Sequence, residues 1–355
     1  MNDFSRRLLV LLGATLFLQT VHAEVAETAA IRFLSQAEAE DAILDDSAEP
    51  YFERLEPLEM KAKVGHALKS TSLEDQREEC RALYRDAVEE FTPKEKAALT
   101  WYVEQIQPVL QRDYPLFAKT PWSFMKVSPF LEGGLPHTRG EQIILSPLLL
   151  RTMIQMDSSE RKESLSEFGE MLVHEQMHVF QRSHPAMFVE LYRDFWEFEH
   201  IQVIEPDPWL KKHQLTNPDA VECNWIFPLR KGGTTRWIWP LVIFKDTSGI
   251  PKMPQDFRRV AIELEKTEDG FTIEKNEAGD PVVTDLLSIP DYAKNFPGTT
   301  DIYHPNEASA DLFALIFVYD AWVSKSSITD GERNQWEKKY GELREWFRAH
   351  LQNDP

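Results

Sequence analysis

The stretch His174-Glu175-Gln176-Met177-His178 places two histidines four positions apart. In an α-helix, residues with this spacing share one face, so that both imidazoles can reach a single metal ion. Zinc accepts neutral imidazole nitrogen, and a catalytic zinc site combines three protein ligands with one water. Glu175 lies one position further round the helix, within reach of that water. We therefore predict that His174 and His178 are zinc ligands and that Glu175 is the catalytic base.

The residues around this motif predict a buried helix. Ser164 and Glu167 have the spacing of a capping box, so the helix is expected to begin near Ser164. Apolar residues then recur with helical spacing, and the neighbours of the motif carry no charge. Histidines and a glutamate in such surroundings need polar partners, and a metal site would provide them. The apolar and uncharged positions are Leu165, Phe168, Leu172, Val173, Gln176, Met177, Val179 and Phe180.

A second motif, Asn306-Glu307-Ala308-Ser309-Ala310-Asp311, lies more than a hundred positions downstream. Its N-E-x-x-x-D pattern resembles the second zinc motif of gluzincins, the thermolysin-like metallopeptidases. The longer H-P-x-E-x-x-A-D form looks like that of exported bacterial zincin-like proteins. The resemblance covers the two motifs and not the whole chain. It implies that Glu307 is the third zinc ligand, that Asp311 accepts a hydrogen bond from His174, and that Asn306 belongs to the same outer layer of the site.

Other residues compete with Glu307 for the third position. His184 lies six positions after the second histidine, where enzymes with the pattern H-E-x-x-H-x-x-G-x-x-H place a third histidine. That arrangement needs a sharp turn at a glycine, but Gln181 stands here instead, and Pro185 follows His184 directly. Glu197 and Glu199 are further alternatives. We predict Glu307 as the ligand.

The N-terminus has the three parts of a secretory signal peptide. Arg6 and Arg7 form a basic start, residues 8–18 an apolar core, and Val21-His22-Ala23 a cleavage site with small residues. The core is shorter than a membrane span requires, and an uncleaved anchor is the alternative. We predict that residues 1–23 are removed and that the protein is exported, periplasmic or secreted, without a membrane contact after cleavage.

The chain is strongly acidic. Its formal net charge is −20, and loss of Asp3, Arg6 and Arg7 with the signal peptide makes it −21. Such a chain repels phosphate backbones and anionic membrane surfaces, so we predict no nucleic-acid partner. The two cysteines, Cys80 and Cys223, either form a disulfide, which export permits, or stay free and buried.

The pattern of elements predicts an α+β fold. Residues 24–115 read as a helical N-terminal region, and residues 116–355 as a zincin-like catalytic domain with a β-rich insertion at about 220–290, between the two metal motifs. By the gluzincin resemblance, residues 137–145 include an edge strand to which an extended substrate pairs by β-augmentation.

Several side chains outside the motifs are candidates for contact with a substrate. His137 and Arg139 either contact it or stabilise a turn. A hydrolase also needs a donor for the developing oxyanion. The candidates near the motifs are Tyr192, Tyr303 and His304. Aromatic residues of the insertion either line a cleft or pack a sheet; these are Trp225, Trp237, Trp239 and Phe244.

Together these patterns predict an exported zinc-dependent hydrolase, a metallopeptidase acting on a peptide or protein substrate. Two alternatives belong to other classes: an exported zinc-binding protein without activity, and a helical binding module in which the histidine motif is coincidental. The glutamate at position 175 argues against a purely structural zinc, because such a site closes with a fourth side chain and needs no base.

Overall fold

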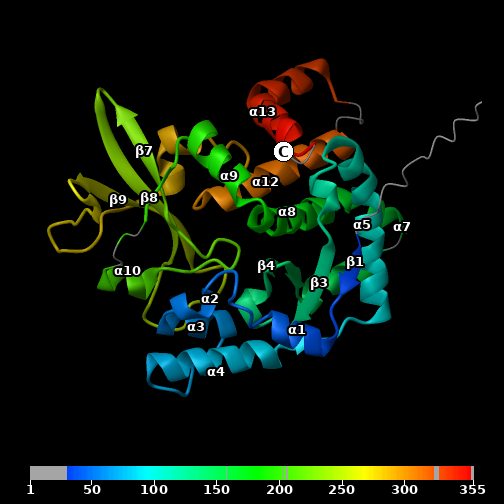
Figure 1. Cartoon of the computed structure of the whole chain (residues 1–355), viewed down its shortest axis with the longest axis horizontal. Helices are drawn as coiled ribbons and strands as arrows, with labels where there is room; N and C mark the ends of the chain where they lie inside the picture. The colour runs from blue at the N-terminus through cyan, green and yellow to red at the C-terminus, as the bar shows by residue number, and fades with distance from the viewer. Residues whose placement is uncertain (1–29, 157, 203, 205–206, 324–327, 353–355) are drawn as a thin grey trace, which may run out of the picture.

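The computed structural model describes residues 30–352 except 157, 203, 205–206 and 324–327. The predicted signal peptide, residues 1–23, lies outside the described residues. The described chain combines helices with two separate β-sheets, consistent with the predicted α+β class (Figure 1). No helix among the described residues is long and apolar enough to cross a membrane.

The first sheet has the strand order β1-β3-β5-β4, and β2 pairs with β3. Neighbours β1, β3 and β5 are parallel, whereas β4 runs antiparallel to β5 and forms one edge. Because β1 and β2 come from the N-terminal region, that region is part of this sheet. The strands are β1 (Ile31–Phe33), β2 (Val88–Glu89), β3 (Trp122–Val127), β4 (His137–Arg139) and β5 (Gln142–Leu145).

Both faces of this sheet are buried. Successive side chains of a strand point to opposite faces, so Phe124 and Ile143 join one core while Met125 and Ile144 join another. The second core lies against the N-terminal helices, drawn below the sheet in Figure 1. These helices are α1 (Gln36–Ala42), α2 (Tyr51–Arg54), α3 (Pro57–Val64) and α4 (Leu73–Asp86). On the other side lies α5 (Pro93–Asp113), which begins with a capping box at Thr92.

Helices α8 (Leu165–Ser183) and α12 (Pro305–Val318) pack against each other in the centre of the molecule (Figure 1). Helix α8 begins where predicted, but the prediction of a capping box between Ser164 and Glu167 is wrong. Ser164 already has helical backbone angles, and its hydroxyl lies 2.9 Å from the Tyr102 hydroxyl and 3.1 Å from the Arg161 carbonyl oxygen. The short helix α7 (Ser158–Glu163) leads directly into α8, so no free helix end remains to be capped.

The second sheet is antiparallel and lies between α8 and α12 in the sequence. Its order is β10-β9-β8-β7-β6, with β11 paired to β9. The four aromatic residues that could line a cleft are all buried in it, which is the packing alternative. The strands are β6 (Glu199–His200), β7 (Trp225–Lys231), β8 (Thr234–Phe244), β9 (Phe257–Thr267), β10 (Gly270–Ile273) and β11 (Val283–Asp285).

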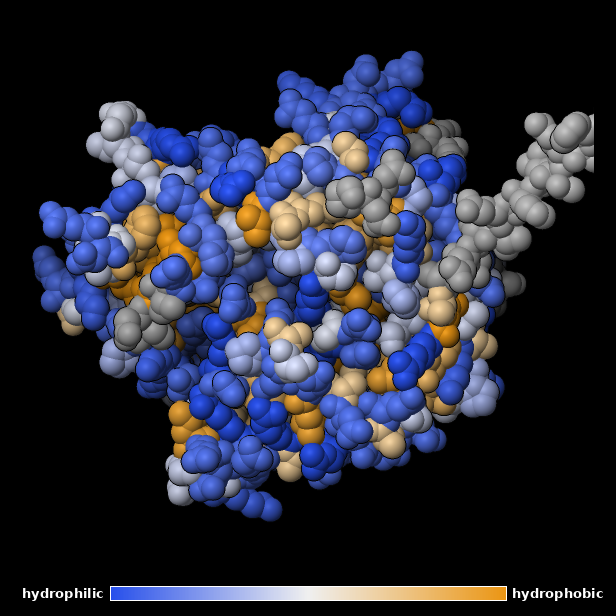
Figure 2. Space-filling model, in the orientation of Figure 1, coloured by the Kyte–Doolittle hydropathy of each residue, from blue (hydrophilic) through white to orange (hydrophobic). Residues whose placement is uncertain are grey.

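The remaining helices surround these layers. The helix that ends at Glu190 continues as a π-helix from Leu191 to Phe195. Cys80 and Cys223 are both free and buried. The face drawn in Figure 2 is mostly hydrophilic, with hydrophobic groups in separate small areas. The remaining helices are α6 (Pro147–Gln155), α9 (Pro185–Glu190), α10 (Pro208–His213), α11 (Pro290–Ala293) and α13 (Asp330–His350).

Candidate metal centre

The packing of α8 against α12 brings His174, His178 and Glu307 together. One ligand atom from each residue lies within 4.8 Å of the other two. The two Nε2 atoms are 3.0 Å apart. Glu307 Oε2 lies 3.6 Å from His174 Nε2, and its Oε1 lies 3.5 Å from His178 Nε2. Residues more than a hundred positions apart in the sequence therefore form one group, which we call the His174 cluster.

Each imidazole of the His174 cluster is oriented by a partner at its other nitrogen. His174 Nδ1 lies 2.7 Å from Asp311 Oδ1, the contact that the resemblance implies. His178 Nδ1 lies 2.8 Å from Oε1 of Gln181, a partner that sequence reasoning missed although it stands only three positions away. Such partners hold a metal-binding imidazole in one orientation and tautomer.

The amide of Gln181 determines which nitrogen of His178 carries the proton. Its Nε2 donates to the Asn306 carbonyl oxygen at 2.9 Å and to Ser309 Oγ at 2.8 Å. Its Oε1 must therefore accept the proton of His178 Nδ1, which leaves Nε2 of that imidazole with a lone pair directed into the cluster. The backbone carbonyl of Asn306, the residue before Glu307, therefore supports His178 through this amide.

Burial and hydrogen bonds change the pKa values of the two histidines in opposite directions. Burial lowers the pKa of His178 to about 4, so this imidazole is neutral. Burial also lowers the pKa of His174, but hydrogen bonds with Asp311 and Glu307 outweigh it and raise the pKa well above its ordinary value. The two carboxylates around His174 therefore favour a positive charge at this place, which a proton or a metal cation can provide.

Glu175 is buried next to the cluster and lines a cavity. Its Oε2 atom has no hydrogen-bond partner among the described residues. Burial raises the pKa of Glu175 well above its ordinary value, and the charge of Asp219 adds to this effect. A carboxyl group in such surroundings accepts a proton more readily than one in water.

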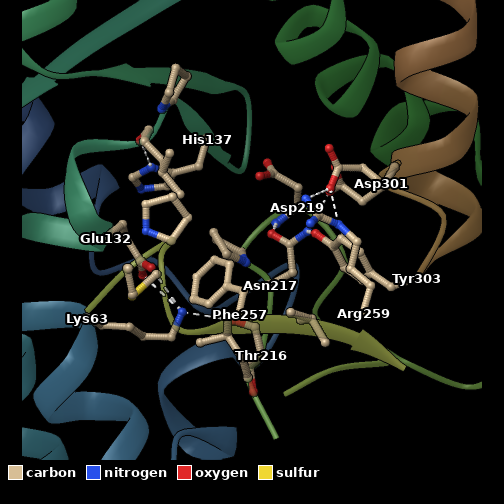
Figure 3. A pocket seen from close by; sticks show the side chains of 18 of the residues that line it. Lys63, Glu132, His137, Thr216, Asn217, Asp219, Phe257, Arg259, Asp301 and Tyr303 are labelled. Carbon is tan, nitrogen blue, oxygen red and sulfur yellow. Dashed lines mark hydrogen bonds and ion pairs between the residues drawn. The ribbon is translucent and has the colours of Figure 1, made fainter. Parts of the chain in front are cut away.

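The cavity has a volume of about 310 Å³ and reaches from the His174 cluster to the N-terminal helices. Figure 3 shows Lys63 and Glu132 at one end, and Arg259 with Asp301 near the other. Asn217, between them, donates from Nδ2 both to Glu307 and, at 2.6 Å, to the Tyr303 hydroxyl. Tyr303 is thus an acceptor in this bond, and its own proton is left to donate to another group.

The rival ligands lie away from the cluster. His184 stacks on Phe180, with the ring centroids 4.0 Å apart, and its Nδ1 lies 2.9 Å from the Ser183 hydroxyl. Glu197 is exposed and forms an ion pair with Arg230. Glu199 is also exposed, on strand β6. Of the four candidates, the described structure brings only Glu307 to the two histidines.

The predicted oxyanion donors separate in the same way. Tyr192 OH lies 3.2 Å from Oγ of Ser309, a residue of α12. His304 caps α12, and its Nε2 lies 3.0 Å from the Glu222 carbonyl oxygen. Of these three residues, only Tyr303 lines the cavity.

Strand β4 has the predicted edge position, but its use by a substrate backbone is contradicted. Thr138 N–H points away from β5 and donates to Asp219 Oδ1 at 2.7 Å. Arg139 is also occupied, since its Nη2 lies 2.6 Å from Asp46 Oδ1. His137 does line the cavity. No local sequence pattern shows that the carboxylate of Asp219 reaches strand β4.

Comparisons with protein-family models, curated proteins and solved structures find no match to this chain. The interpretation of the candidate site therefore rests on its geometry and chemistry. Zinc binding, hydrolysis and export remain predictions, and the contacts above bear only on the first two.

Proposed function

We propose that the protein is a zinc-dependent hydrolase that cleaves peptide or closely related amide bonds. One observation carries the proposal: ligand atoms of His174, His178 and Glu307 converge within 4.8 Å, next to the unpartnered carboxylate oxygen of Glu175. Two imidazoles and one carboxylate are a ligand set typical of catalytic zinc. The proposal keeps the gluzincin type that the two sequence motifs resemble.

The spacing of the ligand atoms fits a zinc ion. Bonds from zinc to nitrogen or oxygen are about 2.0–2.2 Å long, so two ligands of one tetrahedral ion lie about 3.4 Å apart. The three separations in the His174 cluster are 3.0, 3.6 and 3.5 Å. The lone pair on His178 Nε2 and the hydrogen bond from His174 to Asp311 prepare both imidazoles as ligands.

The surrounding residues would carry the proton transfers. When bound, zinc would polarise the substrate carbonyl and activate water. Glu175 would accept a proton from the attacking water and return it to the departing amine. Tyr303, whose pKa burial raises well above its ordinary value, stays protonated and would donate a hydrogen bond to the oxygen that becomes negative. Asn217 would hold that phenol in position.

A zinc-binding protein without activity is the second candidate. A structural zinc site closes with four protein ligands, whereas the cluster found among the described residues contains three. A coordination position that is left open beside a cavity and a buried carboxylate suits a catalytic zinc site better than a structural one. We therefore prefer the hydrolase.

The test combines zinc content with cleavage of a mixed peptide library, for the wild type, Glu175→Gln and Glu167→Gln. Glutamine has nearly the size of glutamate but accepts no proton, so Glu175→Gln should keep one zinc per chain while hydrolysis falls by about 10²–10⁴-fold. Glu167 lies on the same helix but does not line the cavity, so Glu167→Gln should match the wild type.

The outcomes separate the alternatives. Undiminished hydrolysis by zinc-loaded Glu175→Gln would exclude the proposed base. Zinc binding without hydrolysis of any peptide would favour the inactive zinc-binding protein. A wild type that binds no zinc would favour a helical binding module.

A further inference from the structure

Residues 215–220 form a buried segment without helix or strand, which we call the crossing segment. Leu215, Thr216, Asn217 and Asp219 have exposed fractions of 4, 6, 9 and 7 %. Connecting segments usually run over the surface, because buried backbone groups must find hydrogen-bond partners. Residues 215–219 of this segment line the cavity. The hydrogen-bond partners of the segment therefore determine whether it is a fixed wall.

The first end of the crossing segment is bound to helix α3. Thr216 donates its N–H to Glu59, and its hydroxyl lies 3.3 Å from Glu59 Oε2. The carbonyl oxygen of Thr216 accepts from Lys63 Nζ at 2.8 Å. Lys63 in turn lies 3.0 Å from Glu132 Oε2. All four residues are buried, so water does not compete for these bonds.

The other end is bound to α8, α12 and β4. Arg182 Nη2 donates to the Pro218 carbonyl oxygen at 2.8 Å, and Asn306 Nδ2 donates to the Asp219 carbonyl oxygen at 3.3 Å. Asp219 Oδ1 accepts from Thr138, from N–H at 2.7 Å and from Oγ1 at 2.5 Å. Hydrogen bonds therefore hold the crossing segment at both of its ends, and it is a fixed part of the cavity wall.

The contact with Thr138 has a consequence for substrates. In an antiparallel pair, the N–H and C=O groups of a residue point together, either to the partner strand or away from it. Thr138 points away from β5, at the position where a peptide added to the edge of the sheet would form its hydrogen bonds. Asp219 occupies that position, so an extended peptide cannot pair with β4 unless the crossing segment leaves.

The size of the cavity leads to the same conclusion. A sphere of about 310 Å³ is roughly 8 Å across, or about 11 Å when the radius of a water molecule is added on each side, the length of about three extended residues at about 3.3–3.6 Å each. Met253, Pro254 and Phe257 line the cavity together with the crossing segment. A volume of this size is at the lower limit for small-molecule sites, about 300–1,000 Å³.

We infer that the site accepts compact substrates, namely peptides or amide-linked amino-acid derivatives of two to three residues, and excludes extended segments of protein chains. The inference rests on the proposed function, because it concerns the substrate of the same site. The crossing segment is the wall that imposes the limit, and Phe257 lines the same cavity.

The test is a series of peptides that share one scissile bond and grow from two to about ten residues, or roughly 35 Å when extended. The value of kcat/KM is measured for each by mass spectrometry with the zinc-loaded full chain. We expect kcat/KM to fall roughly 10²-fold for the longer peptides, because a backbone that cannot enter the cavity cannot place its carbonyl correctly.

Two phenylalanine variants test whether the cavity wall sets the limit on peptide length. Phe257→Ala removes a ring from the wall and should move the length limit upwards, so that longer peptides gain relative to short ones. Phe271→Ala removes the same ring from strand β10 of the same sheet, outside the cavity, and should leave the length profile unchanged. An identical profile for the wild type and Phe257→Ala would overturn the role of this wall.

The series also separates this inference from the proposed function. Equal or faster cleavage of the longest peptides overturns the inference and leaves the hydrolase standing. If no member is cleaved, the hydrolase fails, and calorimetric binding of the same peptides to zinc-loaded Glu175→Gln decides the inference. Tighter binding of the short members then supports it, and equal or absent binding overturns it.

Discussion

Two groups of buried ionisable side chains contribute residues to the wall of one cavity. The buried charges are compensated differently in the two groups. The Lys63 cluster, consisting of Tyr51, Glu59, Lys63, Tyr84 and Glu132, contains its own cation. Lys63 Nζ lies 3.0 Å from Glu132 Oε2 and 3.9 Å from Glu59 Oε1. Both tyrosine hydroxyls donate to Glu132.

The pKa values of its acids follow from that arrangement. Burial raises the pKa of Glu132, but Lys63, His137 and the tyrosine hydroxyls together lower it below its ordinary value. Burial raises the pKa of Glu59 to about 7, against the opposing effect of Lys63. Opposite charges and hydrogen-bond donors are thus already present within the Lys63 cluster.

The His174 cluster lacks such a partner. Its three ligand atoms all offer lone pairs once Nε2 of His174 is unprotonated, and no lysine or arginine of the described residues contacts them. The first arrangement is typical of a structural network and the second of a metal site. Burial of charge alone therefore does not identify a functional site, whereas convergence of metal-ligand atoms without a lysine or arginine does indicate one.

The largest effect is expected when a ligand is removed from the His174 cluster. Glu307→Ala should lower zinc affinity by several orders of magnitude, because one of three direct bonds to the ion is lost. His184→Ala is the matched control and should bind zinc as the wild type does, since this imidazole contacts Ser183 and Phe180 instead. Competition with a chelator measures both affinities. The reverse pattern would identify His184 as the ligand.

The second prediction tests the Lys63 cluster. Lys63→Met leaves two buried carboxylates without their cation, so the free energy of unfolding should fall by about 3–5 kcal/mol. Zinc stoichiometry should not change, because no atom of Lys63 is a ligand. Lys61→Met, on the same helix but partly exposed, should stay within about 0.5 kcal/mol of the wild type. Urea denaturation measures both, and loss of zinc from folded Lys63→Met would show that the two clusters are not separate.

The smallest effect is expected for the outer layer of the His174 cluster. Asp311→Ala removes the carboxylate that orients His174 and should weaken zinc binding by roughly 10–100-fold, less than loss of a ligand. Asp291→Ala, an exposed residue paired with Lys294, should have no effect on zinc. Isothermal calorimetry with zinc measures the affinities, and an unchanged Asp311→Ala protein would make this contact irrelevant to the metal.

Much of the local structure could be predicted because it depends on nearby residues. Thr92 and Glu95 have the spacing of a capping box, and α5 begins there. The predicted capping box at Ser164 is wrong, because a preceding helix takes its place, and the chain after Glu190 continues as a π-helix. In both places the outcome depends on neighbours that capping and periodicity rules do not include.

The shared helix face of the two histidines and the place of Glu175 beside them follow from local sequence, because an i, i+4 spacing has the same geometry in every α-helix. The family resemblance implies Glu307 and Asp311. That Asn217, Asp219 and Lys63 border the same cavity follows from the three-dimensional packing alone. These contacts join residues far apart in the chain, through buried hydrogen bonds whose partners no local pattern specifies.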